Sequence, residues 1–302
     1  MEFITGALAA IGAGIITNPL DVVKVRFQLQ GELKEKGTHR VYYKHFLHAF
    51  YVIGRTEGIT ALQKGLGPAL VFQVLLNGTR LGVYEVAEKR KLNLKPDGSM
   101  SLLNLLGIGS VAGVLGACAG SPLYLVKIHL QSHAAASIAV GYQHPHQGTL
   151  EALATIRRQY GVAGLWRGVS GACVRLVVAS CSQLSGFYLT RELLEDYKVL
   201  SAEKSLMNTI VASAAGGTLT AFTMNPFDVI ATRLYNQGVD KNGKGLLYKN
   251  YFDCVRKVFK IEGITGLYKG VIPQLARCGP HTVLCLVFWD ILKNNLSSIY
   301  PD

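Results

Sequence analysis

Two arginines lie inside long apolar stretches of this 302-residue sequence, where a charged side chain needs a partner. Arg175 belongs to the stretch 169–190 and Arg277 to the stretch 271–289, and neither stretch contains an aspartate or a glutamate. The planar guanidinium group can donate two parallel hydrogen bonds, which suits a carboxylate or a sulfate. The two arginines therefore predict a binding site whose ligand, a small anion, is their counter-ion.

Other side chains are candidate neighbours of these arginines. Phe72, like each arginine, stands seven residues after the glycine of a short repeated element, and it reduces the room for bulky ligands. Gln73 and Asn77 could donate hydrogen bonds beside it, although packing accounts for them as well. Arg80 could bind the anion or extend to the membrane surface. His281, one turn from the second arginine, could carry a coupled proton or simply be hydrogen-bonded.

A second set of charges belongs to a motif that occurs three times. Its copies begin at Pro19 (PLDVVKVRFQ), Pro122 (PLYLVKIHLQ) and Pro226 (PFDVIATRLY), with separations of 103 and 104 residues. Such a period indicates a whole unit repeated three times, and a proline inside a helix predicts a bend at each copy. The units are assigned to residues 1–97, 98–199 and 200–302.

Long uncharged segments must position these residues. Residues 3–20, 98–126 and 205–227 contain no Asp, Glu, Lys or Arg, and each carries a motif proline near its end. About 20 apolar residues suffice for a helix that spans a bilayer. A second apolar segment follows in every unit, after a short amphipathic stretch. We therefore expect an all-α membrane protein with two spans and one short helix per unit.

Composition disfavours several other classes of protein. The chain is 49% hydrophobic and 17% charged, whereas about 25% of residues are charged in soluble domains. Its net charge of +12 admits a nucleic-acid interpretation, but no nucleic-acid motif is present. A soluble helical-repeat scaffold would have repeats of about 20–50 residues and would not carry such uncharged segments. No nucleophile–base pair indicates an enzyme.

Neither the cysteines nor the loop histidines predict a metal site. The six cysteines form no CxxC pair, and most fall inside apolar segments as buried small residues do. Four histidines are assigned to loops without a convincing ligand set: His45, His48, His144 and His146. We expect neither a metal nor another cofactor.

Charge in the loops predicts the orientation of the chain. The loops inside the units, 31–64, 132–171 and 238–272, carry six, three and seven basic residues against three, one and three acidic ones. Positively charged loops remain on the side from which a membrane protein is inserted. These loops are therefore expected to face the interior compartment, with both termini on the opposite side.

Together these patterns resemble the mitochondrial carrier family, solute carrier family 25. The resemblance rests on a threefold P-x-[DE]-x-x-[KR]-x-[KR] motif, each copy followed by [DE]-G-x-x-x-x-[aromatic]-[KR]-G, and it covers essentially the whole chain. It implies a pseudo-threefold bundle of six transmembrane helices with three short matrix helices. It also implies solute exchange by alternating access in the inner mitochondrial membrane, with both termini toward the intermembrane space.

Segments such as PLYLVKIHLQ, TRLYNQ and RCGPHTVLCLVFWD are similar to the oxaloacetate-carrier branch of that family. This similarity implies a small anionic metabolite such as oxaloacetate, with malate, malonate, sulfate or phosphoenolpyruvate as relatives. A nucleotide carrier and a proton-leak carrier are the alternatives within transport. The other implied partner is the lipid bilayer, including cardiolipin; the protein is expected to be a monomer that binds no nucleic acid.

The resemblance also implies a gate on the matrix side, in which the acid of each odd-numbered span pairs with the base of the next. Asp21 is then expected to meet Lys127, and Asp228 to meet Lys24. Exposed ion pairs contribute about 0.2–1 kcal/mol each, so the differential binding of a small substrate could open such a gate. The third pair is replaced by Tyr124 and Ala231. The brace positions beneath the pairs are occupied by Gln28, Gln131 and Tyr235.

A second gate is implied near the outer ends of the even-numbered spans. Glu85 with Arg191 is the ion pair expected there. The remaining positions do not pair ionically, since Tyr188 stands opposite Lys293 and Asp290 opposite Glu88. We hypothesise that this weaker gate leaves the empty protein open to the cytoplasmic side, away from the matrix.

Overall fold

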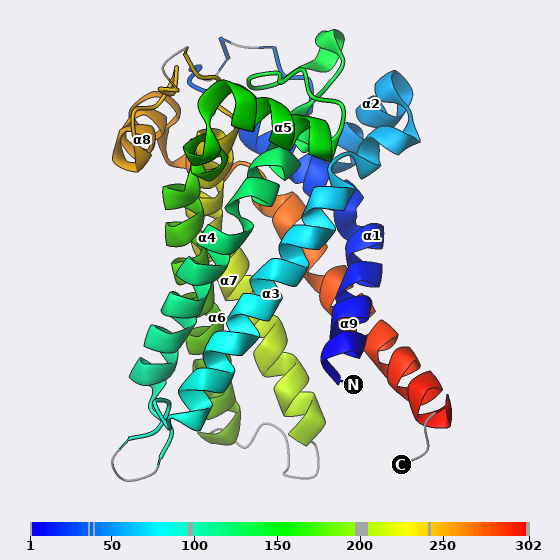
Figure 1. Cartoon of the computed structure of the whole chain (residues 1–302), viewed down its shortest axis with the longest axis vertical. Coiled ribbons are helices and arrows are strands. Elements are labelled where there is room, and N and C mark those ends of the chain that lie inside the picture. Colours follow the sequence, from blue (N-terminus) through cyan, green and yellow to red (C-terminus); the bar gives the residue numbers. More distant parts are fainter. Residues whose placement is uncertain are drawn as a thin grey trace.

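Six long helices build the molecule, which a computed structural model describes for residues 2–35, 37–38, 40–95, 99–196, 205–240 and 243–299. They are α1 (Glu2–Leu29), α3 (Leu66–Lys89), α4 (Leu102–Ser132), α6 (Val169–Asp196), α7 (Ser205–Asn236) and α9 (Val271–Ile299). Three shorter helices, α2 (Phe46–Glu57), α5 (Thr149–Tyr160) and α8 (Tyr251–Leu267), lie together at one end (Figure 1). Each third of the chain thus supplies two long helices and one short helix.

The long helices have the length and composition of membrane spans. Among the described residues, five stretches qualify by hydropathy, and they lie in α1, α3, α4, α6 and α9. The sixth helix, α7, is 32 residues long, and its residues 205–227 carry no charge. The predicted all-α architecture, with two long helices in each of three repeats, is confirmed.

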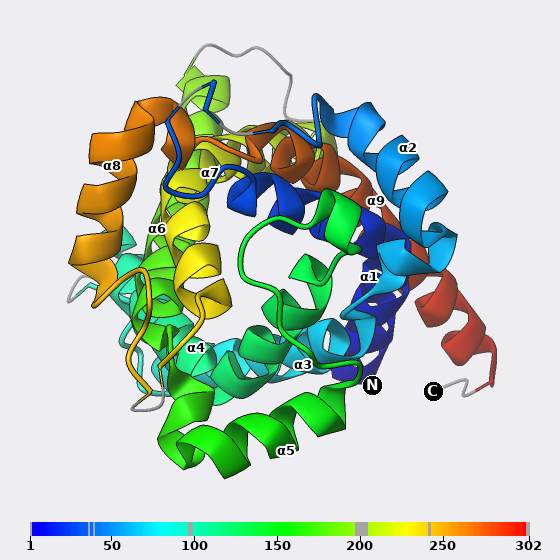
Figure 2. The same ribbon diagram turned by 90° about the horizontal axis from the view of Figure 1, so that it is seen from above.

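The six long helices form a ring around a central axis, as the view from above shows (Figure 2). Neighbouring helices pack in the order that the repeats impose, with extensive contacts in the pairs α3–α4, α6–α7 and α1–α9. The first turn of α1 and the last turns of α9 both lie away from α2, α5 and α8 (Figure 1). The motif prolines, Pro19, Pro122 and Pro226, lie inside α1, α4 and α7.

Three glycines set the approach of one repeat to the next. Gly65, Gly168 and Gly270 have φ values of 72°, 88° and 83°, a region that side chains rarely adopt. A Cβ atom at these positions would lie 2.8, 3.0 and 3.0 Å from the side chains of Gln131, Tyr235 and Gln28, respectively. Each glycine therefore packs against the brace position of the following repeat in the ring, and a larger residue would push the two repeats apart.

An ion cluster fastens each of two short helices to its long helix. In repeat one, Arg26 binds both carboxylate oxygens of Glu57 at 2.5 and 3.0 Å, and Lys64 binds the same carboxylate at 2.7 Å. Repeat three has the same arrangement, in which Arg233 and Lys269 bind Glu262. In repeat two the corresponding positions are His129, Tyr160 and Arg167. The second repeat therefore lacks the carboxylate of this cluster.

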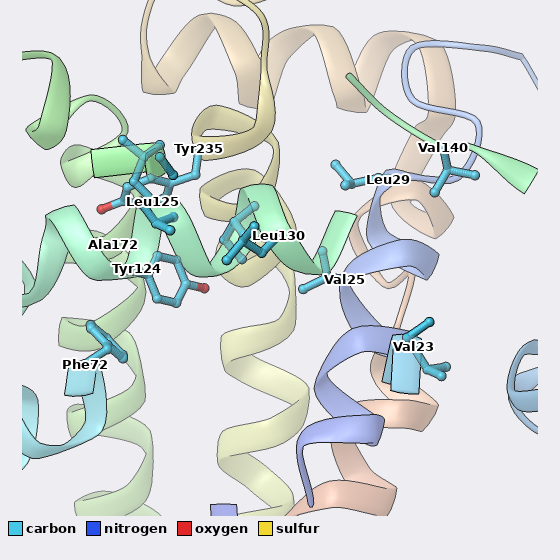
Figure 3. Close-up of a cluster of buried hydrophobic side chains, with 14 of the residues drawn as sticks. Val23, Val25, Leu29, Phe72, Tyr124, Leu125, Leu130, Val140, Ala172 and Tyr235 are labelled. Atoms are coloured by element: carbon cyan, nitrogen blue, oxygen red, sulfur yellow. The ribbon is translucent and has the colours of Figure 1, made fainter. Parts of the chain in front are cut away.

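A hydrophobic core fills the bundle between the motif prolines and the short helices. Figure 3 shows Phe72, Tyr124, Leu125 and Tyr235 gathered from α3, α4 and α7. The Tyr124 ring centroid lies 5.0 Å from that of Phe72 and 5.0 Å from that of Tyr235. Of these rings, that of Tyr124 also lies beside two of the charged residues described next, Lys127 and Arg175.

Candidate functional site

Two buried ion pairs join neighbouring repeats at the motif prolines. Lys127 Nζ lies 2.9 Å from Asp21 Oδ2, which links α4 to α1. Lys24 Nζ lies 2.8 Å from Asp228 Oδ2, which links α1 to α7. These are the two pairs that the sequence predicts. Their side chains are at most 13% exposed, so the pairs are far better shielded from water than surface ion pairs.

Each of the two candidate binding arginines contacts the carboxylate of one of these ion pairs. Arg277 Nε lies 2.7 Å from Asp21 Oδ1, although the two atoms are not aligned for a hydrogen bond. Arg175 Nη1 lies 3.4 Å from Asp228 Oδ1. The sequence predicted that these arginines would lack a carboxylate partner, and that prediction was wrong. The carboxylates come from α1 and α7, so they could not be recognised within the arginines' own apolar stretches.

The resulting network holds more positive than negative charge. Its four cations are Lys24, Lys127, Arg175 and Arg277, and its two carboxylates are Asp21 and Asp228. Two positive charges are therefore not balanced within the network. Burying unbalanced charge is costly, so this arrangement favours the binding of an anion with two negative charges.

Neutral side chains complete the network on one side. Gln28, at a brace position, donates a 2.6 Å hydrogen bond to Asp228 and accepts one of 2.7 Å from Thr232. Lys24 donates a 2.9 Å hydrogen bond to Gln274. The second brace residue, Gln131, donates instead to Asn18 at 3.1 Å. The two ion pairs are thus supported unequally.

Aromatic residues occupy the position where a third ion pair would lie. The guanidinium carbon of Arg175 lies 4.9 Å from the centre of the Tyr124 ring, within range of a cation–π interaction. The hydroxyl groups of Tyr235 and Ser121 are 2.9 Å apart and hydrogen-bonded. Phe72 is only 8% exposed and packs between Tyr124 and Gly120, so its ring lies in the core. Ala231, the expected partner of Tyr124, packs against Gly171.

The remaining candidate residues lie farther toward the outer ends of the long helices. His281 contacts Thr17 Oγ1 through Nδ1 at 3.2 Å and Cys285 through Nε2 at 3.7 Å. Gln73 and Asn77 are half-buried on α3 and make no side-chain hydrogen bond to another described residue. Arg80 lines a cavity of about 290 Å³ together with Tyr84, Ser180, Gln183, Leu184, Phe187, Ser213 and Gly216.

The predicted outer gate is described only in part. Glu85 forms an exposed ion pair with Lys89, one turn along α3, at 2.6 Å. The side chains of its expected partner Arg191 and of Asp290 and Lys293 lie outside the described residues. The pairing of Glu85 with Arg191 therefore stays a prediction.

The structure also gathers histidines that the sequence assigned to loops without a ligand set. His144 and His146 lie against His129, from the last turn of α4. Their sequence separation concealed this cluster, because a loop carries the first two back to the end of the helix. No spacing along the chain could have identified it.

Comparisons with known proteins agree with this architecture. A family profile described as "Mitochondrial carrier protein" matches residues 1–94, 98–198 and 202–300. Human solute carrier family 25 member 35 is 46% identical over 97% of this chain and 98% of the relative. The mitochondrial oxaloacetate transport protein of Schizosaccharomyces pombe is 41% identical, over 95% of this chain and 88% of its own.

A third relative, the mitochondrial citrate transporter E of Aspergillus niger, is 40% identical over 94% of this chain and 89% of its own length. The profile covers all three repeats, and the first long helix of each repeat contains a motif proline. This protein is therefore a member of the mitochondrial carrier family, a transporter rather than an enzyme.

Proposed function

We propose that this protein moves small dicarboxylates of the oxaloacetate class across the inner mitochondrial membrane by alternating access. The observation that carries the proposal is the excess of two positive charges in the buried network. A dianion of oxaloacetate, malate or malonate would balance this charge, and so would sulfate. The name of the Schizosaccharomyces pombe relative, which refers to oxaloacetate, supports the same class of substrate. The name of the Aspergillus niger relative refers to a tricarboxylate, citrate, which is why citrate belongs in the test below.

Arg175 and Arg277 are the proposed substrate contacts. Each lies on the second long helix of its repeat, α6 or α9, and each already faces a carboxylate. The contact of Arg277 with Asp21 is close but poorly aligned, and Nε of Arg175 is buried without a hydrogen-bond partner. A bound dicarboxylate can offer both guanidinium groups better-aligned acceptors than the protein does.

The shared carboxylates supply the proposed coupling between binding and gating. Asp21 and Asp228 each contact one lysine of an inter-repeat ion pair and one arginine of the binding site. An anion that takes over the arginines changes the charge around both carboxylates at once. Substrate binding then alters the stability of the inter-repeat pairs, which is the differential interaction that a conformational change requires.

The sidedness follows the positive charge of the loops. We place α2, α5 and α8 in the matrix and the ends of α1 and α9 toward the intermembrane space. With the inter-repeat ion pairs formed, the bundle is closed by its network and aromatic core on the matrix side. A nucleotide carrier and a proton-leak carrier are the competing assignments.

Counterflow into proteoliposomes tests this function directly. Vesicles would be loaded with oxaloacetate, malate, malonate, sulfate, phosphoenolpyruvate, citrate or ATP, and uptake of a labelled substrate would be measured. We expect saturable exchange with the small dianions and none with ATP. Preference for ATP, or proton flux that needs no substrate, would instead support one of the competing assignments.

Substitutions separate the binding site from general damage. Arg175→Gln and Arg277→Gln should each reduce saturable uptake by at least about tenfold, because one lost charge-assisted hydrogen bond is worth about 1.5–3 kcal/mol. Arg277→Lys should restore part of the loss by restoring charge without the planar fork. Arg55→Gln, on the exposed face of α2, is the matched control. Wild-type uptake by both glutamine variants would refute the assignment of the site.

A further inference from the structure

Three buried histidines meet where the second repeat contacts the third. His129 lies in the last turn of α4, and His144 and His146 lie in the segment that precedes α5. Their residues are 1%, 7% and 6% exposed. One nitrogen from each ring lies within 4.8 Å of the other two. Histidines so deeply buried and so close together are unusual for a solvated loop.

Backbone carbonyls determine which ring nitrogens can accept. Nε2 of His129 lies 3.0 Å from the carbonyl oxygen of Tyr235, and Nε2 of His144 lies 3.0 Å from that of Asn236. A carbonyl only accepts, so both Nε2 atoms carry the proton and both Nδ1 atoms carry a lone pair. Histidine ligands of metals commonly show this pattern, with the second nitrogen donating to a backbone carbonyl.

One of these lone pairs has no partner in the protein. Nδ1 of His129 is buried and makes no hydrogen bond. A buried acceptor without a donor is destabilising, and native proteins rarely retain one without a reason. An unprotonated ring nitrogen of this kind is the atom through which histidine binds a metal ion.

The second repeat differs from the other two at the position of His129. Repeats one and three put an arginine at the position of His129 and pair it with a glutamate, Glu57 or Glu262. Repeat two has no such carboxylate, and Arg167 lies instead over the ring of Tyr160. His129 donates instead to the carbonyl of Tyr235, which corresponds to the Gln131 carbonyl that Arg26 binds in repeat one.

We propose that His129, His144 and His146 bind a divalent transition-metal ion such as Zn²⁺, one nitrogen from each, with the fourth position left to water. Imidazole nitrogens suit zinc, and three histidines with one open position are an established coordination set. The ion would tie the segment before α5 to the end of α4. Because His129 and His144 donate hydrogen bonds to carbonyls of Tyr235 and Asn236 in α7, it would also hold in place the part of repeat two that contacts repeat three.

The ring geometry predicts that binding requires a small rearrangement. The rings of His129 and His144 are stacked, with centroids 3.4 Å apart and planes at 11°. Nitrogens bound to a tetrahedral zinc ion lie about 3.4 Å apart with their rings turned toward the metal. The rings must splay, and the nitrogens must approach one another by up to about 1.4 Å. The charge of Arg167 opposes the ion, whereas that of Glu151, which acts on His146, favours it.

The test is metal binding by the purified full-length protein without a polyhistidine tag. Co²⁺ would be titrated while its visible absorption is recorded, and Zn²⁺ would then be added as a competitor. We expect one Co²⁺ per chain, a spectrum of tetrahedral coordination, and a rise in melting temperature with Zn²⁺. Replacing a residue that only hydrogen-bonds to a metal ligand lowers metal affinity about 10–100-fold. His146→Ala removes a ligand itself, so it should lower the affinity at least that much.

Two controls keep the outcome decisive. His45, which is exposed, and His48, which is half-buried, lie at the start of α2 with ring centroids 5.6 Å apart, and their double alanine variant should bind the metal as the wild type does. His146→Ala loses no hydrogen bond of the cluster that fastens the loop, so it should fold; its melting temperature without metal verifies this. Equal affinity of the wild type and His146→Ala, or loss of binding only in the His45/His48 variant, overturns the proposal.

Discussion

Asp228 is the most heavily used side chain of the buried network. Its residue is fully buried, and its carboxylate contacts Lys24 at 2.8 Å, Gln28 at 2.6 Å and Arg175 at 3.4 Å. Replacing a single member of a buried ion pair leaves the partner's charge uncompensated, which is more damaging than removing both. The stability of the bundle should therefore depend strongly on this one carboxylate.

Asp228→Asn is expected to lower the stability of the closed bundle by about 3–5 kcal/mol, because it leaves Lys24 and Arg175 buried without their counter-charge. For a protein of this size that corresponds to a decrease in Tm of at least about 5 °C. Thermal unfolding in detergent measures it. Glu85→Gln is the control, since Glu85 meets only exposed Lys89 in the described structure. Equal Tm values for the two variants would contradict a stabilising role of the network.

Glu262 makes stability depend on pH at a site outside the membrane spans. Burial raises the pKa of Glu262, but hydrogen bonds and charge from Arg233 and Lys269 outweigh it and bring the pKa below the usual 4.5. A lowered folded-state pKa adds stability above the unfolded value, and this stability is lost as pH falls through the folded value. The stabilisation that the Glu262 carboxylate contributes should therefore be fully present at pH 7.

We expect Glu262→Gln to melt below the wild type at pH 7, and the difference to shrink as the pH falls below about 4.5, where the wild-type carboxylate takes up a proton. Melting curves of both proteins over this range provide the measurement. Glu57→Gln repeats the test in repeat one, where Arg26 and Lys64 hold the carboxylate. A difference in Tm that stays constant down to pH 3 would exclude this explanation.

At the scale of elements, the turn between each short helix and the next long helix decides how closely the repeats approach. Gly65, Gly168 and Gly270 combine a positive φ with a side chain of the following repeat at 3.0 Å or less from their missing Cβ. The constraint is therefore both conformational and steric. It explains why a glycine stands at the same place in all three repeats.

Gly168→Ala should destabilise the protein, since alanine in the left-handed region costs about 1–2 kcal/mol and its Cβ would meet the Tyr235 ring. Gly54→Ala is the matched control. That glycine lies inside α2 with no atom within 4 Å of its missing Cβ, and alanine there should add up to about 1 kcal/mol. Tm shifts of opposite sign are expected; a shared sign would show that the turn imposes no constraint.

At the scale of the whole molecule, the two ends of the bundle differ. The motif prolines and the two inter-repeat ion pairs lie in the halves of α1, α4 and α7 that lead to α2, α5 and α8, whereas the cavity lined by Arg80, Gln183 and Ser213 lies toward the other ends of α3, α6 and α7. This asymmetry supports the hypothesis that the empty protein rests open to the intermembrane side.

Labelling of single cysteines tests that hypothesis. In a variant lacking the native cysteines, Gln183→Cys should react with a membrane-impermeant thiol reagent added from the intermembrane side. Ser121→Cys is the control, because Ser121 is fully buried beside Tyr235 and should stay unlabelled from either side. Faster labelling of Gln183→Cys from the matrix side would reverse the assigned resting state.

The sequence alone determined the architecture and the two inter-repeat ion pairs. Repetition at 103 and 104 residues makes corresponding positions comparable, and uncharged segments long enough to cross a bilayer leave little choice of secondary structure. The pairs Asp21–Lys127 and Asp228–Lys24 followed from the family resemblance and the order of the repeats. The architecture is visible in spacing along one chain, whereas the two pairs were implied by the resemblance.

Only the tertiary structure shows that the arginines contact the carboxylates, that the Phe72 ring lies in the core, and that His129 lies beside His144 and His146. The contacts of Arg277 with Asp21, of Arg175 with Asp228 and of Phe72 with Tyr124 lie at corresponding positions of the three repeats, but each depends on how far a side chain reaches across a helix interface. The histidine cluster depends on the course of a loop. Distance in space is set by packing, which residue types and spacing do not encode locally. The candidate site therefore changed from two isolated arginines into one shared charge network.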